Sequence, residues 1–180
     1  GNTVEDVRNY GIITTQDIMV KSSNVGMAKL VLKAGGFPQW LRDKLQLHTK
    51  SGVHYPGEVS GGIAPVKDED TFGTATLSFG YGLNMSAAQL AKLYTAIASG
   101  GVVKPLRLVR GEPDSHKPYR LFSEATTKKL HTMMRMAVSS KGTGRLSADW
   151  GGEVAGKTGT TYLHTAKGYD KSSYVASFAG

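Results

Sequence analysis

The sequence predicts an α+β fold in which an antiparallel sheet packs with helices. Several segments repeat apolar residues at helical spacing, most clearly over residues 86–100. Two apolar runs rich in strand-forming residues, 153–161 and 174–179, are separated by about a dozen mostly polar residues. We expect these two runs to pair as antiparallel strands joined by a long polar connection.

Three helices are predicted before residue 46. The run Thr14-Thr15-Gln16-Asp17 starts a short first helix, because hydroxyl and acidic side chains favour the positive end of a helix. The cap-forming residues Ser22-Ser23-Asn24 interrupt it, and a second apolar pattern then runs over residues 25–32 and stops at Gly35-Gly36. A third helix begins at Phe37-Pro38, since proline suits a first turn.

Residues 48–76 lack periodicity and are rich in glycine, proline and polar side chains, so we predict an extended surface excursion. The acidic run Lys67-Asp68-Glu69-Asp70 lies within it. No histidine or second carboxylate group is spaced to converge with this run. We interpret it as a solvated charge run rather than a metal or acid-base site.

The clearest helix start in the chain is Ser86, which can form a capping box with Gln89. The predicted buried face of this helix consists of apolar residues at helical spacing, namely Leu90, Leu93, Tyr94 and Ile97. Gly100-Gly101 ends the helix, and an extended segment follows over residues 102–106. Residues 79–82 are predicted as a turn between apolar runs.

Another helix is predicted from Ser123 to about Val138. Its apolar stripe is interpreted as core and consists of Leu130, Met133, Met134, Ala137 and Val138. Residues 139–145 are then expected to form a loop.

The composition is that of one packed domain and excludes several function classes. Lysine and arginine number 22 against 14 acids, a net charge of +8, but the basic residues are scattered and no nucleic-acid signature accompanies them. Cysteine is absent and the five histidines are isolated, so we expect no metal and no cofactor. Gly142-Thr143-Gly144 lacks the later residues of a phosphate loop. No apolar run approaches the ~20 residues that a membrane span needs.

Residues 153–161 are predicted to form a strand edge that bears functional groups. Lys157 places a cation on this edge, and the hydroxyls of Thr158 and Thr160 flank Gly159. Gly156 and Gly159 remove side chains, which would let another molecule approach the backbone.

The Ser22-Ser23-Asn24 junction and the Lys157-Thr158-Gly159 strand occur in the order of a known catalytic signature. That signature is Ser-x-x-Lys, then a Ser-x-Asn triplet, then Lys-Thr-Gly, as in penicillin-binding proteins and serine β-lactamases. Two of its three parts are present here. Taken alone, the junction has a simpler interpretation, in which Ser23 or Asn24 only caps the second helix.

With further stretches, these motifs resemble the transpeptidase domain of class B penicillin-binding proteins, most of all the division-specific type. The stretches are Lys21-Ser22-Ser23-Asn24-Val25-Gly26, Tyr55-Pro56-Gly57-Glu58, Ser78-Phe79-Gly80-Tyr81-Gly82, Gln89-Leu90-Ala91 and Val154-Ala155-Gly156-Lys157-Thr158-Gly159-Thr160. The resemblance implies a penicillin-binding protein/serine β-lactamase-like fold.

The same resemblance implies an activity and a location. Proteins of this family are membrane-anchored D,D-transpeptidases on the periplasmic face of the bacterial inner membrane. They cross-link peptidoglycan stem peptides through an acyl-serine intermediate and are acylated by β-lactam antibiotics. Division-machinery proteins are the partners that this resemblance implies, and nucleic acid is not among them.

The resemblance assigns catalytic roles to Ser22, Asn24 and Lys157. Ser22 would relay a proton towards the departing alanine amine. Asn24 would donate its amide to a carbonyl of the substrate and hold the lysine of the missing motif.

A second set of residues would bind the substrate or a β-lactam. Lys157 would supply a positive field for the terminal carboxylate, which the hydroxyls of Thr158 and Thr160 would bind. Gly159 would let the acyl group approach the strand. The backbone N–H of Thr160 would form half of an oxyanion hole.

One part of the family signature is missing, because no serine of this chain is followed by lysine three positions later. We therefore expect residues 1–180 to be a partial transpeptidase domain that lacks the Ser-x-x-Lys segment upstream and a terminal strand and helix downstream. Alone, this fragment should be inactive. A noncatalytic module of the same fold that binds wall peptides or a partner protein stays open. The Ser-Ser-Asn and Lys-Thr-Gly-Thr variants disfavour a β-lactamase or carboxypeptidase.

Overall fold

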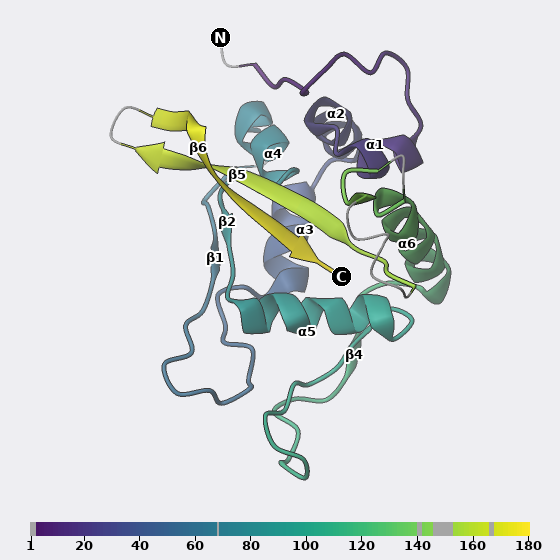
Figure 1. Ribbon diagram of the computed structural model, residues 1–180. Coiled ribbons are helices and arrows are strands. Elements are labelled where there is room, and N and C mark those ends of the chain that lie inside the picture. The colour runs from purple at the N-terminus through teal and green to yellow at the C-terminus, as the bar shows by residue number, and fades with distance from the viewer. Residues whose placement is uncertain (1–2, 68, 140–141, 146–152, 166–167) are drawn as a thin grey trace.

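A computed structural model describes residues 3–67, 69–139, 142–145, 153–165 and 168–180. The helices are α1 (Thr15–Lys21), α2 (Asn24–Ala34), α3 (Phe37–Leu45), α4 (Thr71–Leu77), α5 (Ala87–Ala98) and α6 (Glu124–Ala137). The strands are β1 (Gly62–Ile63), β2 (Leu83–Asn84), β3 (Val102–Val103), β4 (Tyr119–Arg120), β5 (Lys157–Thr165) and β6 (Gly168–Ala179). Figure 1 shows the long β5–β6 hairpin running across the helices, which confirms the predicted α+β class.

Helices α1, α2 and α3 form where their terminal residues predict. The predicted start of α1 is confirmed, and Thr14 and Asp17 form a capping box there. Ser23 caps α2, and its hydroxyl accepts a hydrogen bond from the backbone N–H of Gly26 at 2.9 Å. Gly35 then ends α2. The interpretation of the junction as a helix cap is therefore confirmed for Ser23.

The prediction of a surface excursion over residues 48–76 is wrong in two respects. Asp70 caps the unpredicted helix α4 by accepting a hydrogen bond from the N–H of Gly73 at 2.8 Å, and Leu77 of that helix is 1% exposed. The chain also turns inward at Glu58, whose side chain accepts from the buried N–H of Ser51 at 2.7 Å. Capping and buried hydrogen bonds build this region, and apolar periodicity does not detect either. Residue 68 of the acidic run lies outside the described residues.

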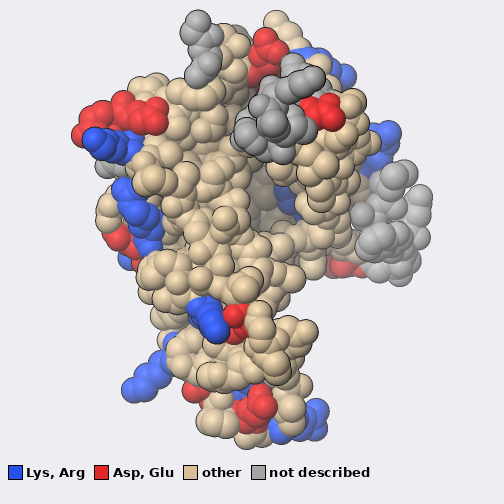
Figure 2. Space-filling view, turned by 90° about the vertical axis from the view of Figure 1, so that its left-hand side faces the viewer, with Lys and Arg blue, Asp and Glu red and all other residues tan. Residues whose placement is uncertain are grey.

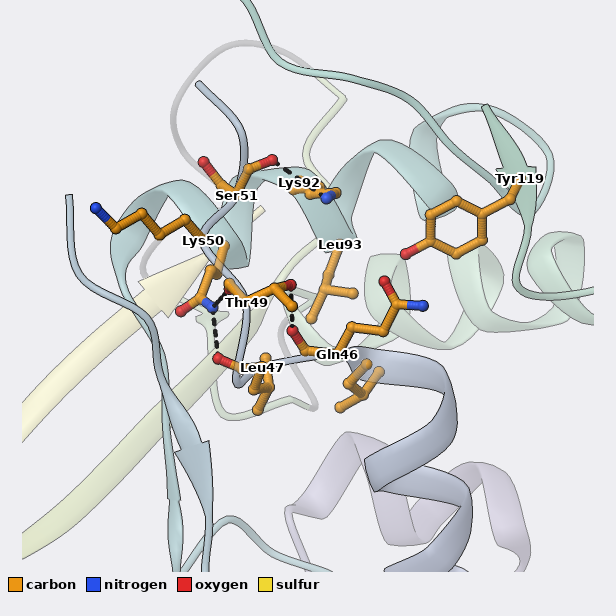
Figure 3. Close-up of a pocket in the computed structure, with 10 residues that line it drawn as sticks. Gln46, Leu47, Thr49, Lys50, Ser51, Lys92, Leu93 and Tyr119 are labelled. Carbon is orange, nitrogen blue, oxygen red and sulfur yellow. Dashed lines mark hydrogen bonds between the residues drawn. The ribbon is translucent and has the colours of Figure 1, made fainter. Parts of the chain in front are cut away.

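Two polar side chains of α5 fasten the segment that follows α3. The Nε2 of Gln89 donates to the carbonyls of Leu47 (2.8 Å) and Thr49 (2.7 Å). The Nζ of Lys92 donates to the carbonyl of Ser51 at 3.2 Å. Figure 3 shows Lys92 and the segment residues Leu47, Thr49 and Ser51 around a pocket between the segment and α5. Burial lowers the pKa of the Lys92 ammonium.

This contact changes which face of α5 is buried. Gln89 is 4% exposed, whereas Leu90, which we predicted to be buried, is 36% exposed. The other predicted members Leu93, Tyr94 and Ile97 are half-buried. The prediction for Leu90 is therefore wrong, because the backbone carbonyls packed against α5 need donors and draw the glutamine inward.

Replacing Gln89 by leucine should lower the free energy of unfolding by about 2–3 kcal/mol, because it leaves two carbonyls without their donor. Urea unfolding of the chain measures this loss. The matched control is Gln39→Leu, since Gln39 is an exposed residue of α3 and the change should stay within about 0.5 kcal/mol. Equal losses in the two variants would show that the buried amide contributes nothing.

Helix α6 matches the prediction from its cap to its core. The hydroxyl of Ser123 accepts from the N–H of Thr126 at 3.1 Å. Of the predicted stripe, Met134, Ala137 and Val138 are at most 5% exposed, and Leu130 and Met133 are half-buried. Residues 140–141 of the predicted loop lie outside the described residues.

The β5–β6 hairpin confirms the antiparallel pairing but not the long connection. Lys157 pairs with Ala179 and Gly159 with Ser177, and the pairing continues to Thr165 with a register shift at Tyr162/Leu163. The residues expected to form a connection are therefore mostly strand; residues 166–167 lie outside the described part. Threonine and tyrosine side chains have strand propensity despite their polarity, which an apolar-run criterion overlooks.

Two short antiparallel pairs, β1–β2 and β3–β4, complete the described sheet structure. On the face drawn in Figure 2, lysines and arginines are scattered among acidic residues and form no continuous basic patch. Within the described ranges, no helix is both long and apolar enough to cross a membrane. The same ranges contain no cluster of three or more histidine, aspartate or glutamate residues that could hold a metal ion.

Candidate active site

Lys157 and Ser22, 135 residues apart in the sequence, meet in the structure. Lys157 is the first residue of β5, and its Nζ donates a hydrogen bond to the Oγ of Ser22 at 2.9 Å. The same ammonium donates to the carbonyl of Thr158 at 2.9 Å. The two motifs that the sequence places far apart therefore form one cluster.

The conformation of Ser22 is unusual and exposes its hydroxyl. Ser22 follows the last residue of α1 with φ 56° and ψ 46°, a left-handed conformation that costs a non-glycine residue roughly 1–2 kcal/mol. Its neighbour Ser23 is 3% exposed and performs the capping. Because the Ser23 hydroxyl accepts the hydrogen bond that caps α2, the Ser22 hydroxyl is not needed as a cap and contacts Lys157 instead.

Asn24, the third residue of the triplet, is the first residue of α2 and is half-buried. Within the described residues, no side-chain hydrogen bond joins Asn24 to Ser22 or Lys157. The structure therefore brings Ser22 and Lys157 together. Asn24 is close to Ser22 in the sequence but is not hydrogen-bonded through its side chain to either residue.

Lys157 provides a positive charge that no acid among the described residues neutralises. It is half-buried, and burial lowers the pKa of its ammonium because a charged group is less stable away from water. Among the ion pairs of the described residues, none includes Lys157. A partly desolvated cation without a carboxylate partner is suited to binding an anion.

Thr143 is a member of the cluster that sequence reasoning missed. The Oγ1 of Thr158 donates to the Oγ1 of Thr143 at 2.7 Å. In the sequence, Thr143 lies in a glycine-flanked stretch that does not match a phosphate loop. Its neighbour Gly142 packs so closely on the end of α6 that a Cβ there would lie 2.0 Å from the carbonyl oxygen of Ala137. A hydroxyl between two glycines was the only signal available in the sequence.

Gly156, the residue before β5, differs from the prediction. Gly156 is buried, and a Cβ there would lie 2.3 Å from Cζ of Phe178, so β6 occupies the space that we expected another molecule to use. At Gly159 a Cβ would lie 2.7 Å from Oγ of Ser177. Thr160 is exposed on β5, and no hydrogen bond of the described residues links its side chain to Lys157.

The helices hold β5 in place through its partner strand. The hydroxyl of Tyr94 in α5 donates to the carbonyl of Ala179 at 3.0 Å, and Ala179 pairs with Lys157. Burial raises the pKa of the Tyr94 hydroxyl. On the other edge of β5, no strand of the described residues is paired.

Comparison with known proteins gives one family. The profile described as penicillin binding protein transpeptidase domain matches residues 2–180. A curated relative, the probable peptidoglycan D,D-transpeptidase PenA of Neisseria gonorrhoeae, is 33% identical over 178 residues, which are 98% of this chain and 30% of the relative. The chain therefore spans less than a third of that relative.

Solved structures give the same result. The apo transpeptidase domain of penicillin-binding protein 3 from Burkholderia pseudomallei superposes with a TM-score of 0.83 at 34% identity, over 97% of this chain and 54% of that domain. Penicillin-binding protein 3 of Mycobacterium tuberculosis, complexed with aztreonam, gives a TM-score of 0.83 at 29% identity, over 99% of this chain and 44% of that protein. The fold that the motifs predicted is confirmed.

Proposed function

Because the chain belongs to the penicillin-binding protein transpeptidase family, we propose that it forms part of the active site of a peptidoglycan D,D-transpeptidase. The observation that supports this most is the hydrogen bond between Lys157 and Ser22, which unites two catalytic motifs at 2.9 Å. Residues 1–180 are then a partial domain whose nucleophile, the serine of a Ser-x-x-Lys motif, belongs to a segment outside this sequence.

In the proposed reaction, the nucleophilic serine attacks the penultimate D-alanine carbonyl of a stem peptide. The lysine of its motif takes the hydroxyl proton, the peptide bond breaks, and the terminal D-alanine leaves with that proton on its amine. Ser22 passes the proton along, since its hydroxyl both accepts from Lys157 and retains a hydrogen to donate. A second stem peptide then takes the acyl group. A β-lactam reacts at the same serine by opening its ring.

The substrate carboxylate would bind on β5. Lys157 supplies a cation that makes no ion pair within the described part of the chain, and Thr158 and Thr160 supply hydroxyl donors two residues apart on the same strand face. Thr143 would hold the Thr158 hydroxyl until the ligand arrives, when the hydrogen turns to the carboxylate. Gly159 would give the acyl group room, and the N–H of Thr160 would stabilise the oxyanion.

Asn24 would complete the site only with the missing segment. As the first residue of α2 it follows the fixed cap at Ser23, so its position is set even though its amide is not engaged with Lys157. The amide would donate to the substrate and accept from the lysine of the missing motif. Neither partner is in this chain.

Exposed apolar surface supports the proposal of a partial domain. Leu30 and Leu32 of α2 are 38% and 40% exposed. An apolar pocket of about 320 Å³ lies between α5 and α6 and reaches Ala155 and Gly180. Since apolar surface favours burial by roughly 25 cal/mol per Å², we expect the rest of the domain to cover these faces. The full-length protein would be anchored in the inner membrane, face the periplasm and work with division-machinery proteins.

The 180-residue chain itself should form no covalent penicillin adduct, because it lacks the nucleophile. Intact-mass spectrometry after incubation with penicillin should give the unmodified mass, whereas the full-length protein should gain one penicillin per molecule. A stable adduct on the 180-residue chain would refute the assignment of the nucleophile to a missing segment.

The absence of Ser-x-x-Lys favours one alternative, a noncatalytic module that binds wall peptides or a partner protein. Sequencing the reading frame upstream of Gly1 separates the two. A Ser-x-x-Lys motif there supports the enzyme, and its absence supports the binding module.

A further inference from the structure

The N-terminal segment before α1 grips the junction that bears Ser22. The carboxylate of Asp6 accepts two hydrogen bonds, from Oγ of Ser23 at 2.7 Å and from the backbone N–H of Val25 at 3.1 Å. Four residues later, the hydroxyl of Tyr10 donates to the carbonyl of Lys21 at 3.3 Å. This segment runs alongside α1 and α2 in Figure 1.

The hydrogen bonds from the N-terminal segment fall on alternate residues of the junction, and the proposed site residues lie between them. Among the residues that the structure describes, the N-terminal segment makes hydrogen bonds to residues 21, 23 and 25 but not to Ser22 and Asn24 between them. Ser23 is 3% exposed, and its hydroxyl is engaged both as a donor, to Asp6, and as an acceptor, from the N–H of Gly26 at 2.9 Å. The N-terminal segment therefore contacts the chain on both sides of each site residue, at the backbone of Lys21 and Val25 and at the side chain of Ser23.

The junction needs such a restraint. Ser22 holds a left-handed conformation that an L residue leaves readily unless its surroundings enforce it. A charged acceptor makes stronger hydrogen bonds than a neutral one, and a carboxylate at the start of α2 is also favoured by the helix dipole. Nothing in the proposed reaction uses Asp6 directly.

We propose that Asp6 is a positioning residue for acylation: its carboxylate fixes the turn that presents the Ser22 hydroxyl to Lys157. This inference rests on the proposed function and adds to it a residue from outside both motifs. Asp6 would act through Ser22: its loss removes a conformational restraint on the turn and no chemical group of the reaction.

Asp6→Ala in the full-length protein should lower the rate constant for acylation by fluorescent penicillin about tenfold, because a small misplacement of a reacting group slows a reaction strongly. Asp6→Asn keeps the shape and one carbonyl acceptor and should restore most of the rate. The matched control is Asp17→Ala, which removes another capping carboxylate at the far end of α1 and should leave the rate unchanged.

A double-mutant cycle separates positioning from general stability. If Asp6 acts through Ser22, Asp6→Ala should cause little further loss in a Ser22→Ala background, whereas a merely structural role would give additive losses. Additive losses, or a wild-type rate in Asp6→Ala, would overturn the inference. Absence of labelling in the wild-type protein would instead overturn the proposed function.

Amide hydrogen exchange tests the grip without catalysis and on the 180-residue chain itself. Asp6→Ala should speed exchange at Val25, whose N–H loses its acceptor, and at Gly26, whose partner Ser23 is released. Asp17→Ala should not change these two rates. Unchanged exchange in Asp6→Ala would show that the carboxylate does not hold the junction.

Discussion

Lys157→Ala should lower the rate constant for penicillin acylation of the full-length protein by about 10³-fold. The variant removes the cation that pairs with the penicillin carboxylate, and losing one member of a desolvated charge pair costs about 2–5 kcal/mol. Each ~1.36 kcal/mol of activation free energy changes the rate constant tenfold. The variant loses the cation for the substrate carboxylate and the hydrogen bond to Ser22 together. Fluorescent-penicillin labelling followed over time gives the rate constant.

Two controls show whether the loss comes from charge at this position. Lys129→Ala removes an exposed lysine of α6 and should leave the rate unchanged. Lys157→Arg keeps the positive charge and should retain part of the rate, although its guanidinium cannot reproduce the single contact to Ser22. If Lys157→Ala is acylated at the wild-type rate, Lys157 does not belong to the site.

Replacing Ser22 should slow acylation by about 10²-fold or more, as expected when a group that transfers a proton is lost. Two variants separate this effect from backbone strain. Alanine must keep the costly left-handed conformation, whereas glycine adopts it freely, so Ser22→Gly should be the more stable of the two by about 1 kcal/mol. Both should be equally slow, because both lack the hydroxyl.

The comparison is read from labelling rates and thermal unfolding of the same samples. Ser23→Ala serves as the control for the helix cap and should lose about 1 kcal/mol of stability. Fast acylation in Ser22→Gly combined with slow acylation in Ser22→Ala would mean that conformation matters and the hydroxyl does not.

The sequence was sufficient to predict those helix starts that depend on interactions between residues close together in the chain. The caps at Thr14, Ser86 and Ser123 were all predicted because each hydroxyl reaches a backbone N–H three residues away. Helix α4 was missed for the complementary reason, since it depends on the single cap at Asp70 and has no apolar periodicity. The length of the β5–β6 hairpin was missed because pairing, rather than side-chain polarity, extends it.

The site was predictable as two motifs but not as a geometry. The contact between Lys157 and Ser22 joins residues 135 positions apart, and the left-handed turn at Ser22 has no sequence marker such as glycine. Thr143 enters through one hydroxyl contact made after the loop packs on α6. Asp6 contacts the junction across 17 residues of sequence. Each of these depends on the folded arrangement of separate elements.

A crystal structure of the full-length protein acylated by penicillin is the most direct test of the central claim that β5 and the Ser22 turn form one wall of a penicillin-reactive site. We expect the penicillin carboxylate within about 3 Å of the Thr158 and Thr160 hydroxyls, with Lys157 beside it and in contact with Ser22. A carboxylate bound away from β5, or a Ser22 hydroxyl with no polar contact to Lys157 in that complex, would contradict the claim.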